Sequence, residues 1–413
     1  MKIEEPSGPR VVIFATTKWV TTRHFLLDQL LAMDPSAWEV HIVCQGIPSG
    51  YKPQFDTIKF HEISMERNLA PIRDIVSLAQ WIKLIRVVRP DMVVAGTPKA
   101  SLLGLASALL LRVRTRVYWL HGFRFESERG LFNWILRFAE RATIAAATQV
   151  MMVSQSLKLS ATRNFPRSDR KFTPAVNHPT GIDTNLFVPP TDAQREAARA
   201  LMGLPEGAIA IGFLGRLTPD KGIVFLAEAI ALVARSMPNV VLLIGGDRDE
   251  SRPLSPDQMR DLVSPHIKLV GTLEAPLSFY HALDVFCLPS LREGLPTVVL
   301  EASACGLPVV TTTATGCVDS VVDTETGLLV PPRNSGRLAT AISYLAFDHS
   351  IRSKMGVAGR MWVMENHNLI DVRQNNISTL ESCVNYRPSL ENQLGFRKSF
   401  HRSALWLNTR RRP

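Results

Sequence analysis

The chain has 413 residues and a formal net charge of +10, and 46% of its residues are hydrophobic. This length is too great for one ordinary domain and suits two, and the apolar share excludes wholesale disorder because it can fill sizeable cores. A basic balance fits nucleic acid, an anionic membrane face or phosphorylated substrates, and charge alone does not choose among them.

The composition also sets the expected compartment. The five cysteines have no paired or metal-like spacing, which is typical of buried thiols in a reducing compartment. The N-terminal segment MKIEEPSGPR is polar and acidic where a secretion signal would be basic and then apolar. The longest apolar run, ASLLGLASALLL at 100–111, is shorter than the ~20 residues that a membrane-spanning helix requires. We expect a cytoplasmic protein that can still bind the inner face of the plasma membrane as a peripheral protein.

Short β-branched runs alternate with longer helical patterns in the first part of the chain. Strands are predicted at 11–15, 38–43, 91–95, 116–120 and 149–153, and helices at 21–33, 74–88, 99–111 and 130–147. Such alternation predicts a parallel sheet covered on both faces by helices. The pattern stops at 163–192, a segment rich in Pro, Asn and Asp that is typical of a domain boundary.

The alternation then restarts. Strands are predicted at 209–214, 240–245, 267–270, 284–288 and 308–312, and helices at 222–236, 255–263, 297–305 and 335–346. The fold class is therefore α/β, with doubly wound, Rossmann-like domains at 1–180 and 181–386 and a basic tail at 387–413. The last helix before the tail can cross back to the first domain. Because doubly wound sheets bind ligands at the carboxyl ends of their strands, a cleft between the domains is the expected active site.

The second predicted domain opens with IGFLGRLTPDKG, a buried strand that runs into a turn and then a helix. Arg216 and Lys221 flank this turn, and Gly215 permits close approach of the backbone. The helix that follows adds the positive end of its dipole, so that a guanidinium, an ammonium and a helix start together suit a diphosphate. Taken alone, two such residues are more often solvated surface charges. Neither the Gly-x-Gly-x-x-Gly fingerprint of dinucleotide sites nor a P-loop pattern is present.

The segment REGLPTVVLE, at 292–301, holds a carboxylate on each side of a predicted helix start. Pro296 suits the first helical position, which puts Glu301 about one turn into an otherwise apolar helix. A buried carboxylate needs hydrogen-bond donors, and vicinal sugar hydroxyls are good ones. Glu293 would reach a neighbouring point of the cleft, with the free N–H groups from Gly294 onward between the two acids. On their own, two such acids are more often a dipole acid and a salt-bridged acid, but the nearby Arg/Lys turn favours a ligand site.

Three segments in order resemble a known family: GFLGRLTPDKG, LPSLREGLPTVVLEASACGLPVVTTTATG, and TGLLVPP at 326–332. They are similar to the retaining nucleotide-sugar glycosyltransferases of glycosyltransferase family 4, which have the GT-B fold. The family's hallmark is a pair of glutamates separated by seven residues, matched here by Glu293 and Glu301. In the first domain, TPKASLLGLASALLLRVRTRVYWLHGFRFES resembles bacterial members that build capsule, exopolysaccharide or O-antigen.

The resemblance implies a role for each matched residue of the second domain. Glu301 would hold the ribose hydroxyls of a UDP- or GDP-sugar donor, and Glu293 would contact its sugar. Arg216 and Lys221 would hold its diphosphate. Further donor contacts are implied at Gly215, Val270, Gly294, Leu295, Pro296 and Thr297, with the backbone around Val270 reading the base.

In the first domain the resemblance implies that His121, of the His121-Gly122 pair, points into the cleft near the transferring sugar, although a lone histidine is more often structural. Many members carry paired glycines in the first loop, where this chain has ATTKWVTTRHF. Thr16, Thr17 and Lys18 are the candidates there, and Lys99 is a further candidate for the acceptor.

The expected reaction breaks the bond between the anomeric carbon and a nucleoside diphosphate and transfers the sugar to an acceptor hydroxyl. Arg216, Lys221 and the helix start near 296 would neutralise the leaving diphosphate, so that we expect no metal and no cofactor. The family implies retention of the anomeric configuration. The subgroup suggests an acceptor sugar linked to a lipid diphosphate. Arginines 112, 114 and 116, after the helix at 99–111, either suit anionic lipid headgroups or are solvated charges beside a core helix.

Other classes of protein remain open at this point. A sugar-nucleotide epimerase of the same fold would turn over the donor without an acceptor. A non-catalytic protein that senses nucleotide sugars or scaffolds a membrane assembly would be expected to lack the charged residues that this chain retains. A nucleic-acid binder is disfavoured because no recognition motif is present and phosphate-binding residues explain part of the basic excess.

Overall fold

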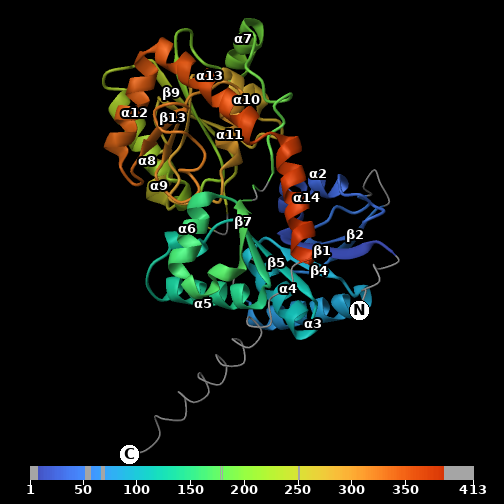
Figure 1. Ribbon diagram of the computed structural model, residues 1–413. Coiled ribbons are helices and arrows are strands. Elements are labelled where there is room, and N and C mark those ends of the chain that lie inside the picture. Colours follow the sequence, from blue (N-terminus) through green and yellow to red (C-terminus); the bar gives the residue numbers. More distant parts are fainter. Residues whose placement is uncertain are drawn as a thin grey trace, which may run out of the picture.

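The computed structural model of the protein describes residues 8–51, 57–66, 70–176, 178, 180–249 and 252–385. The described residues form two lobes, each built on one parallel sheet (Figure 1). The strand orders are β3-β2-β1-β4-β5-β6-β7 and β10-β9-β8-β11-β12-β13. This arrangement confirms the prediction of two doubly wound α/β domains. The predicted tail at 387–413 lies outside the described residues.

The first sheet fans out in both directions from its central strand. Its strands are β1 (Arg10–Lys18), β2 (Trp38–Gln45), β3 (Ile58–Glu62), β4 (Met92–Ala95), β5 (Thr115–Leu120), β6 (Gln149–Met152) and β7 (Phe172–Val176). Its helices are α1 (Trp19–Phe25), α2 (Leu27–Leu31), α3 (Pro71–Val88), α4 (Pro98–Leu110), α5 (Gly130–Ala146) and α6 (Gln155–Asn164), with 3-10 turns η1 (Arg124–Ser127) and η2 (Pro166–Lys171). Because β1 pairs with both β2 and β4, the order reverses beside it, and such a switch point is where ligands bind.

The second sheet has the same plan around β8. Its strands are β8 (Ile209–Leu214), β9 (Val240–Gly245), β10 (Ile267–Gly271), β11 (Val285–Leu288), β12 (Val309–Thr312) and β13 (Gly327–Val330). Its helices are α7 (Asp192–Leu201), α8 (Ile223–Val233), α9 (Pro256–Arg260), α10 (Leu277–Ala282), α11 (Thr297–Ala304), α12 (Ser335–Phe347) and α13 (His349–Asn366), with a 3-10 turn η3 (Pro219–Lys221). Here the order reverses between β8 and β11.

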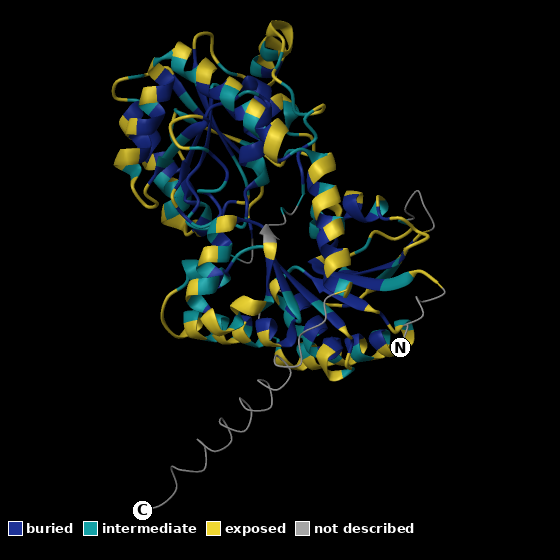
Figure 2. Cartoon of the chain, in the orientation of Figure 1, coloured by how far each residue is buried: buried dark blue, intermediate teal, exposed yellow. Residues whose placement is uncertain are grey.

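Both sheets are buried on their two faces, as parallel sheets generally are. In β1 the run Val12–Ala15 is almost fully buried, and in β8 the same holds for Ala210, Ile211 and Phe213. Figure 2 shows the strands in dark blue inside each lobe and the exposed residues in yellow mainly on the outer helices. All five cysteines are buried free thiols, as predicted. Within the described residues, no helix is both long and apolar enough to span a bilayer.

The chain crosses between the lobes twice, and the two crossings are bonded to each other. The Ile182 N–H donates to the His367 carbonyl at 2.8 Å, and the Leu369 N–H donates to the Ile182 carbonyl at 3.0 Å. A Cβ at Gly181 would lie 2.4 Å from the Leu369 Cα, so only glycine fits at this contact. The two connections between the lobes therefore run side by side.

After the second crossing, α14 (Leu369–Asn385) packs on the first domain (Figure 1). Asn376 donates to the Gln29 side-chain oxygen at 3.0 Å and to the His178 carbonyl at 2.9 Å. Leu380 and Cys383 join the hydrophobic core of the first domain. The last described helix thus belongs to the first lobe in space, although it follows the second lobe in sequence.

Several predicted elements differ from the observed ones. The segment at 163–192 is not simply a linker, because η2 and β7 within it belong to the first domain and β7 pairs with β6. Pro174 inside β7 is tolerated because β7 is an edge strand. The single helix predicted at 21–33 is two helices, separated at Leu26. The short strands β3 and β13 were also missed, because runs of five and four residues carry little periodicity.

Candidate active site

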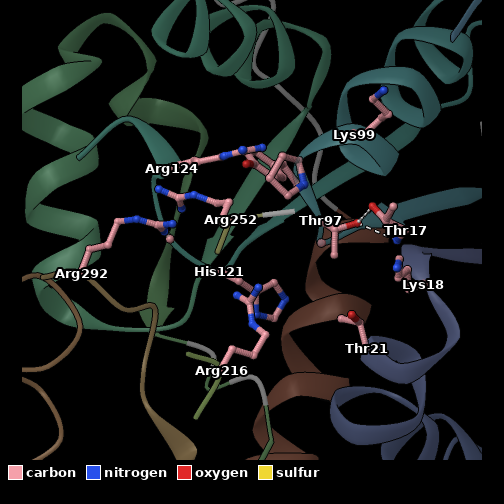
Figure 3. Close-up of a pocket in the computed structure, with 14 residues that line it drawn as sticks. Thr17, Lys18, Thr21, Thr97, Lys99, His121, Arg124, Arg216, Arg252 and Arg292 are labelled. Carbon is pink, nitrogen blue, oxygen red and sulfur yellow. Dashed lines mark hydrogen bonds between the residues drawn. The ribbon is translucent and has the colours of Figure 1, made fainter. Parts of the chain in front are cut away.

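The two switch points face each other across a cavity of about 260 Å³ (Figure 3). The first domain contributes the carboxyl ends of β1, β4 and β5, and the second contributes arginines from the loops after β8, β9 and β11. The lining residues are Thr17, Lys18, Thr21, Gly96, Thr97, Pro98, Lys99, Tyr118, His121, Gly122, Arg124, Arg216, Arg252 and Arg292. Six of them are lysine or arginine and none is acidic, so the cavity attracts anions.

His121 lies just after β5 and its ring faces the cavity. The imidazole stacks on Trp119, with ring centroids 5.6 Å apart, and packs against Gly96. Burial lowers the pKa of His121 to about 4, so the ring is neutral at neutral pH. Among the described residues neither ring nitrogen has a hydrogen-bond partner, which leaves both for a ligand.

The two domains touch through their backbones beside His121. A Cβ at Gly294 would lie 2.2 Å from the His121 carbonyl oxygen, so this arrangement requires glycine at position 294. Gly122 in turn faces the Glu293 backbone. The loops that carry His121 and Glu293 are therefore in contact, although they come from different domains.

Lys221 and Glu293 form an ion pair at the edge of the second domain. The Lys221 Nζ lies 2.5 Å from the Glu293 Oε1, and the Ser290 hydroxyl donates to the same oxygen at 2.7 Å. The family resemblance implied that Lys221 binds the diphosphate of a donor and Glu293 its sugar. In the structure the two side chains are bonded to each other. An ammonium has three N–H donors, so one bond to Glu293 leaves two for phosphate oxygens.

Arg216 is held by an acid that lies outside the sequence motifs. Its guanidinium forms a salt bridge with Asp249, whose side chain is only 7% exposed while that of Arg216 is 50% exposed. Asp247 and Asp249 form an Asp-x-Asp pattern, a residue spacing that binds metals in some proteins. Asp247 accepts a hydrogen bond from Thr272. Among the described residues, no group of three or more His, Cys, Asp or Glu side chains is placed to share a metal ion.

Glu301 lies on α11 and is bonded to Tyr280 of α10. The Tyr280 hydroxyl donates to the Glu301 Oε2 at 2.7 Å. Burial raises the pKa of Glu301, and the Tyr280 hydrogen bond opposes this shift. No partner of the other carboxylate oxygen, Oε1, is found among the described residues. The acid is thus held at one oxygen and open at the other.

The segment TVVLEASA forms α11, as predicted, but Pro296 precedes the first helical residue rather than occupying it. Leu295 is buried, and the Glu293 N–H donates to the Thr315 carbonyl at 2.8 Å. In the described part of the chain, the N–H groups of Gly294, Leu295 and Thr297 have no hydrogen-bond acceptor. A run of free N–H groups at a helix start suits an anion.

Two more predicted donor contacts lie on the second sheet. Gly215 follows β8, and its N–H donates to the Gly245 carbonyl at 3.0 Å. Val270 is a half-buried residue of β10. Neither lines the cavity, and the same holds for Lys221, Glu293, Glu301 and the turn Gly294–Thr297. Of the second-domain predictions, only Arg216 reaches the cavity itself.

The first-loop candidates divide into two kinds. Thr16 is buried, and its hydroxyl bonds to Thr22 at 2.6 Å, so it faces the interior. Thr17 and Lys18 line the cavity, and Thr17 is fixed by Thr97 through two hydrogen bonds of 2.8 and 2.7 Å. These three residues end β1 rather than forming a loop.

Lys99 also lines the cavity, at the start of α4. Its ammonium pairs with Asp74 of α3 at 2.7 Å, and its side chain is largely buried. A lysine held in this way stabilises the helix pair as well as the cavity wall. It is therefore less open to a ligand than Lys18, which is exposed.

Arg124, Arg252 and Arg292 line the cavity and were missed from the sequence. Arg292 directly precedes Glu293, and Arg124 follows His121 by three residues, so proximity to these two predicted residues was the only available signal. Arg252 follows no predicted motif. Tyr280, the partner of Glu301, carried no signal either.

Asp319, in the loop after β12, has a structural contact with the first domain. It accepts from the Ser156 N–H at 3.0 Å, and the Gly316 N–H donates to the Ser156 hydroxyl at 2.7 Å. Ser156 belongs to α6 of the first domain, so these bonds join the two domains. Asp319 is a contact between the lobes.

Two doubly wound domains whose switch points face each other across a cationic cavity define the GT-B class of proteins. The chain of 413 residues matches the family described as "Glycosyl transferase 4-like" over residues 10–155 and the family described as "Glycosyl transferases group 1" over residues 208–348. The two matches cover the two domains separately.

Comparison with individual known proteins leads to the same family as these two matches. The capsular polysaccharide biosynthesis glycosyltransferase CapM of Staphylococcus aureus is 31% identical over 324 residues, which are 78% of this chain and 84% of that protein. The UDP-Gal:α-D-GlcNAc-diphosphoundecaprenol α-1,3-galactosyltransferase of Escherichia coli is 27% identical over 68% of this chain and 73% of its own length. The chain therefore belongs to the family 4-like, group 1 glycosyltransferases.

Solved structures give the same fold. Anabaena HepE in complex with UDP has a TM-score of 0.71 at 20% identity and covers 90% of this chain and 100% of its own. Sucrose-phosphate synthase from Thermosynechococcus elongatus has a TM-score of 0.74 at 18% identity and covers 90% of this chain and 98% of its own. The predictions of a GT-B fold and of a glycosyltransferase are confirmed.

Proposed function

We propose that this glycosyltransferase moves a sugar from a UDP- or GDP-sugar to an acceptor hydroxyl with retention of the anomeric configuration. The observation that carries the proposal is the meeting of His121 with the Glu293 loop across the cleft, beside the cations Arg216 and Lys221. A sugar held between these loops would have a phosphate-binding side in the second domain and an open side in the first.

The leaving diphosphate needs charge stabilisation. Arg216 and Lys221 supply positive charge, and the free N–H groups at the start of α11 supply donors that need no reorganisation when the bond breaks. Because Asp249 and Glu293 already hold the two cations in place, little ordering of these side chains is required on binding. We propose that this stabilisation needs no divalent metal and that no cofactor takes part.

The nucleoside would bind along the second sheet. The open oxygen of Glu301 can accept the ribose hydroxyls while Tyr280 keeps the other oxygen fixed. The backbone around Val270, in β10, would contact the base. This assignment explains why an acid is retained on an otherwise apolar helix whose neighbours Val299, Leu300 and Ala302 are fully buried.

Neutral His121 suits contact with a sugar hydroxyl. Its lowered pKa keeps both a donor and an acceptor nitrogen on the ring at neutral pH. The touching loops around Gly294 and Gly122 would exclude water from the anomeric carbon and so limit hydrolysis of the donor. Retention would follow from attack on the face that the diphosphate leaves.

For the acceptor we propose a sugar linked to a lipid diphosphate, used in bacterial surface-polysaccharide assembly at the inner face of the plasma membrane. The Escherichia coli relative is named for such an acceptor, and the Staphylococcus aureus relative for capsule synthesis. The cationic cavity suits an anionic acceptor. Nucleic acid is not proposed as a partner.

The exposed face of α5 supports a peripheral membrane location. Leu131, Trp134 and Phe138 are 75%, 65% and 61% exposed, and exposed Arg129 and Arg141 flank them. Apolar and aromatic residues beside arginines are typical of helices that lie in the membrane interface. Of the arginines suggested from the sequence, Arg116 is unsuited to this role, because it donates to the carbonyls of Ala146 and Val113 at 2.7 and 2.5 Å.

The test is to incubate the protein with a panel of UDP- and GDP-sugars, with and without bacterial lipid extract, and to measure release of the nucleoside diphosphate. Lipid-dependent release with a new glycolipid of retained configuration by NMR is the expected result. Turnover of a donor in the absence of lipid, with an epimerised sugar as product, would instead establish an epimerase. No release with any donor would refute the proposal.

A further inference from the structure

Three arginines from both domains gather on one wall of the cavity. Arg124 comes from η1 of the first domain, Arg252 from the loop after β9, and Arg292 from the loop after β11 (Figure 3). In the assignment above the donor diphosphate is held by Arg216 and Lys221. The three other arginines are left without a role, and they are a second concentration of positive charge in the same cleft.

Two of the three arginines are held by acids behind the cavity wall. The Arg292 Nη2 lies 2.9 Å from the Asp220 Oδ2, and Arg252 lies 3.5 Å from the same oxygen. Arg252 also pairs with Glu128 of the first domain at 2.6 Å. Asp220 is 7% exposed, and its pKa is lowered by these cations in spite of burial. The acids fix the direction of the arginines and belong to no part of the cavity lining.

Arg124 is the uncompensated member of the group. No hydrogen bond or salt bridge of its guanidinium is found among the described residues, and its side chain is half-buried. Burial and then the nearby positive charge of Arg252 lower the pKa of Arg124. Three guanidinium groups thus share the two carboxylates Asp220 and Glu128. A bound anion would supply the missing negative charge, and phosphate fits the planar fork of arginine well.

The position of Arg124 indicates whether the bound anion belongs to the donor or to the acceptor. Arg124 belongs to the first domain, on the side opposite the predicted nucleoside contacts. Its guanidinium lies 5.8 Å from the centre of the Phe132 ring, at the start of α5. Phe132 belongs to the same helix as the exposed residues Leu131, Trp134 and Phe138. An anion at Arg124 would therefore lie on the first-domain side of the cavity, where the contact with Phe132 connects Arg124 to the helix that carries the surface suited to a lipid.

We propose that Arg124, with Arg252 and Arg292, binds the phosphate groups of the acceptor, so that the cleft holds two separate phosphate sites. This inference rests on the proposed glycosyl transfer and names the part of the acceptor that is recognised. The donor diphosphate occupies the site of Arg216 and Lys221, and the phosphates that link the acceptor sugar to its lipid occupy the three-arginine site. Both domains contribute to the second site, so it is complete only when the cleft is closed.

The first experiment measures binding of inorganic pyrophosphate to the full chain by isothermal titration, in the presence of saturating UDP or GDP, whichever binds. The nucleotide fills the donor site, so any remaining pyrophosphate site is distinct from it. We expect one such site in the wild type, weakened about tenfold or more in Arg124→Ala and in Arg124→Gln because a charge-assisted bidentate contact is lost. Nucleotide affinity should change less than twofold.

The matched control is Arg235→Ala, which removes the same charge from an exposed position on the second domain. It should leave pyrophosphate binding unchanged, and thermal unfolding will show that the variants are folded. Pyrophosphate binding that is absent, that only competes with the nucleotide, or that falls equally in Arg235→Ala would overturn the proposal. Failure of every nucleotide to bind would instead count against the proposed function, while pyrophosphate binding to the free protein would still test Arg124.

A kinetic experiment identifies the source of the phosphate. The acceptors are a lipid-diphosphate-linked sugar that supports transfer and the octyl glycoside of the same sugar, which lacks phosphate. Arg124→Ala should raise the KM of the diphosphate acceptor about tenfold or more and leave the KM of the octyl glycoside and of the donor unchanged. An equal effect on both acceptors, or an effect on the donor, would overturn the assignment of this site to acceptor phosphate.

Discussion

The two domains present their site residues in different ways. In the second domain, Lys221 is paired with Glu293 and Glu301 is bonded to Tyr280. In the first domain, His121 and Arg124 have no polar side-chain partner among the described residues. Lys221 and Glu301 are therefore held in position before any ligand arrives, whereas His121 and Arg124 are left to be completed by a ligand. This difference would suit a proposed donor site of fixed geometry and a proposed acceptor site that its ligand completes.

Substitution of Lys221 gives the strongest test of the difference between the two domains. If this lysine stabilises the leaving diphosphate, Lys221→Ala should lower kcat by about 10²–10³-fold, the usual effect of removing one preorganised donor to a developing charge. Release of nucleoside diphosphate measures it, and circular dichroism checks the fold. Lys354→Ala, at an exposed position on α13, is the matched control and should retain full activity. Full activity of Lys221→Ala would refute the donor site.

The buried acid of the second domain offers a second test. Glu301→Gln should raise the donor KM by about tenfold to a hundredfold, because one acceptor of two ribose hydroxyls is lost. Because burial raises the pKa of Glu301 above 4.5, the wild type should lose donor affinity as the pH falls, and at a higher pH than an ordinary glutamate would give. The donor KM of Glu301→Gln, measured between pH 5 and 8, should lack this dependence; an unchanged profile would exclude Glu301 as its source.

The contact between the domains can be tested at Gly294. A methyl group at this position would lie 2.2 Å from the His121 carbonyl, so Gly294→Ala should push the two loops apart and reduce kcat/KM about tenfold to a hundredfold. Gly336→Ala, at a position in α12 where a Cβ meets no close atom, is the control. Unfolding temperature should change little in either variant. Wild-type kcat/KM in Gly294→Ala would show that this close contact is not needed for transfer.

The membrane surface proposed for the first domain gives a smaller expected effect. Trp134→Ala should weaken binding to vesicles that contain anionic lipid about tenfold, because an exposed indole no longer enters the interface. Co-flotation with phosphatidylglycerol vesicles measures this, with neutral vesicles as reference. Tyr344→Ala removes a half-exposed aromatic ring from the second domain and should have no effect. Equal binding of both variants would locate the membrane surface elsewhere.

The smallest predicted effect concerns stability of the first domain. Glu140 is buried and accepts from Tyr118, a cavity residue, at 2.9 Å, and burial raises the pKa of Glu140 to about 7. Protonated Glu140 therefore stabilises the folded state below about pH 4.5, and this contribution is lost as the pH rises through about 7. Glu140→Gln should reduce the fall of Tm between pH 5 and 8 by a few degrees, whereas exposed Glu325→Gln should not. An unchanged slope would refute the assignment.

The second-domain candidates could be selected because they are local in sequence, and one of them, Arg216, lines the cavity. Arg216 and Lys221 lie in one turn, and Glu293 and Glu301 lie on one short segment, so their spacing together with the family resemblance selected them. Their partners were not predictable. Asp249 and Tyr280 reach the site only through pairing of distant strands and packing of helices, which leave no pattern in the sequence.

In the first domain, the predicted residues that line the cavity are Thr17, Lys18, Lys99 and His121, whereas Arg124 was missed. His121 was predicted because it precedes a glycine at the end of a strand. Arg124 could not be predicted, because it becomes part of a cationic cluster only when the contact between the domains places Arg252 and Arg292 near it. Thr16 was selected by its position, and its hydroxyl turned out to bond to Thr22 inside the domain. Neighbouring threonines alternate sides along a strand, and the sequence did not show how far β1 extends.

The paired crossings near Ile182 and Leu369 limit how the lobes can move. Because the two connections are bonded to each other, they act as a single hinge, and the lobes can swing apart about it more easily than they can slide. Such a swing would break two contacts between the lobes, the ion pair of Arg252 with Glu128 and the hydrogen bond from Ser156 to Asp319. Opening to release products would thus separate the residues of the three-arginine site. The pair of Lys221 and Glu293 would stay intact, because both residues belong to one lobe.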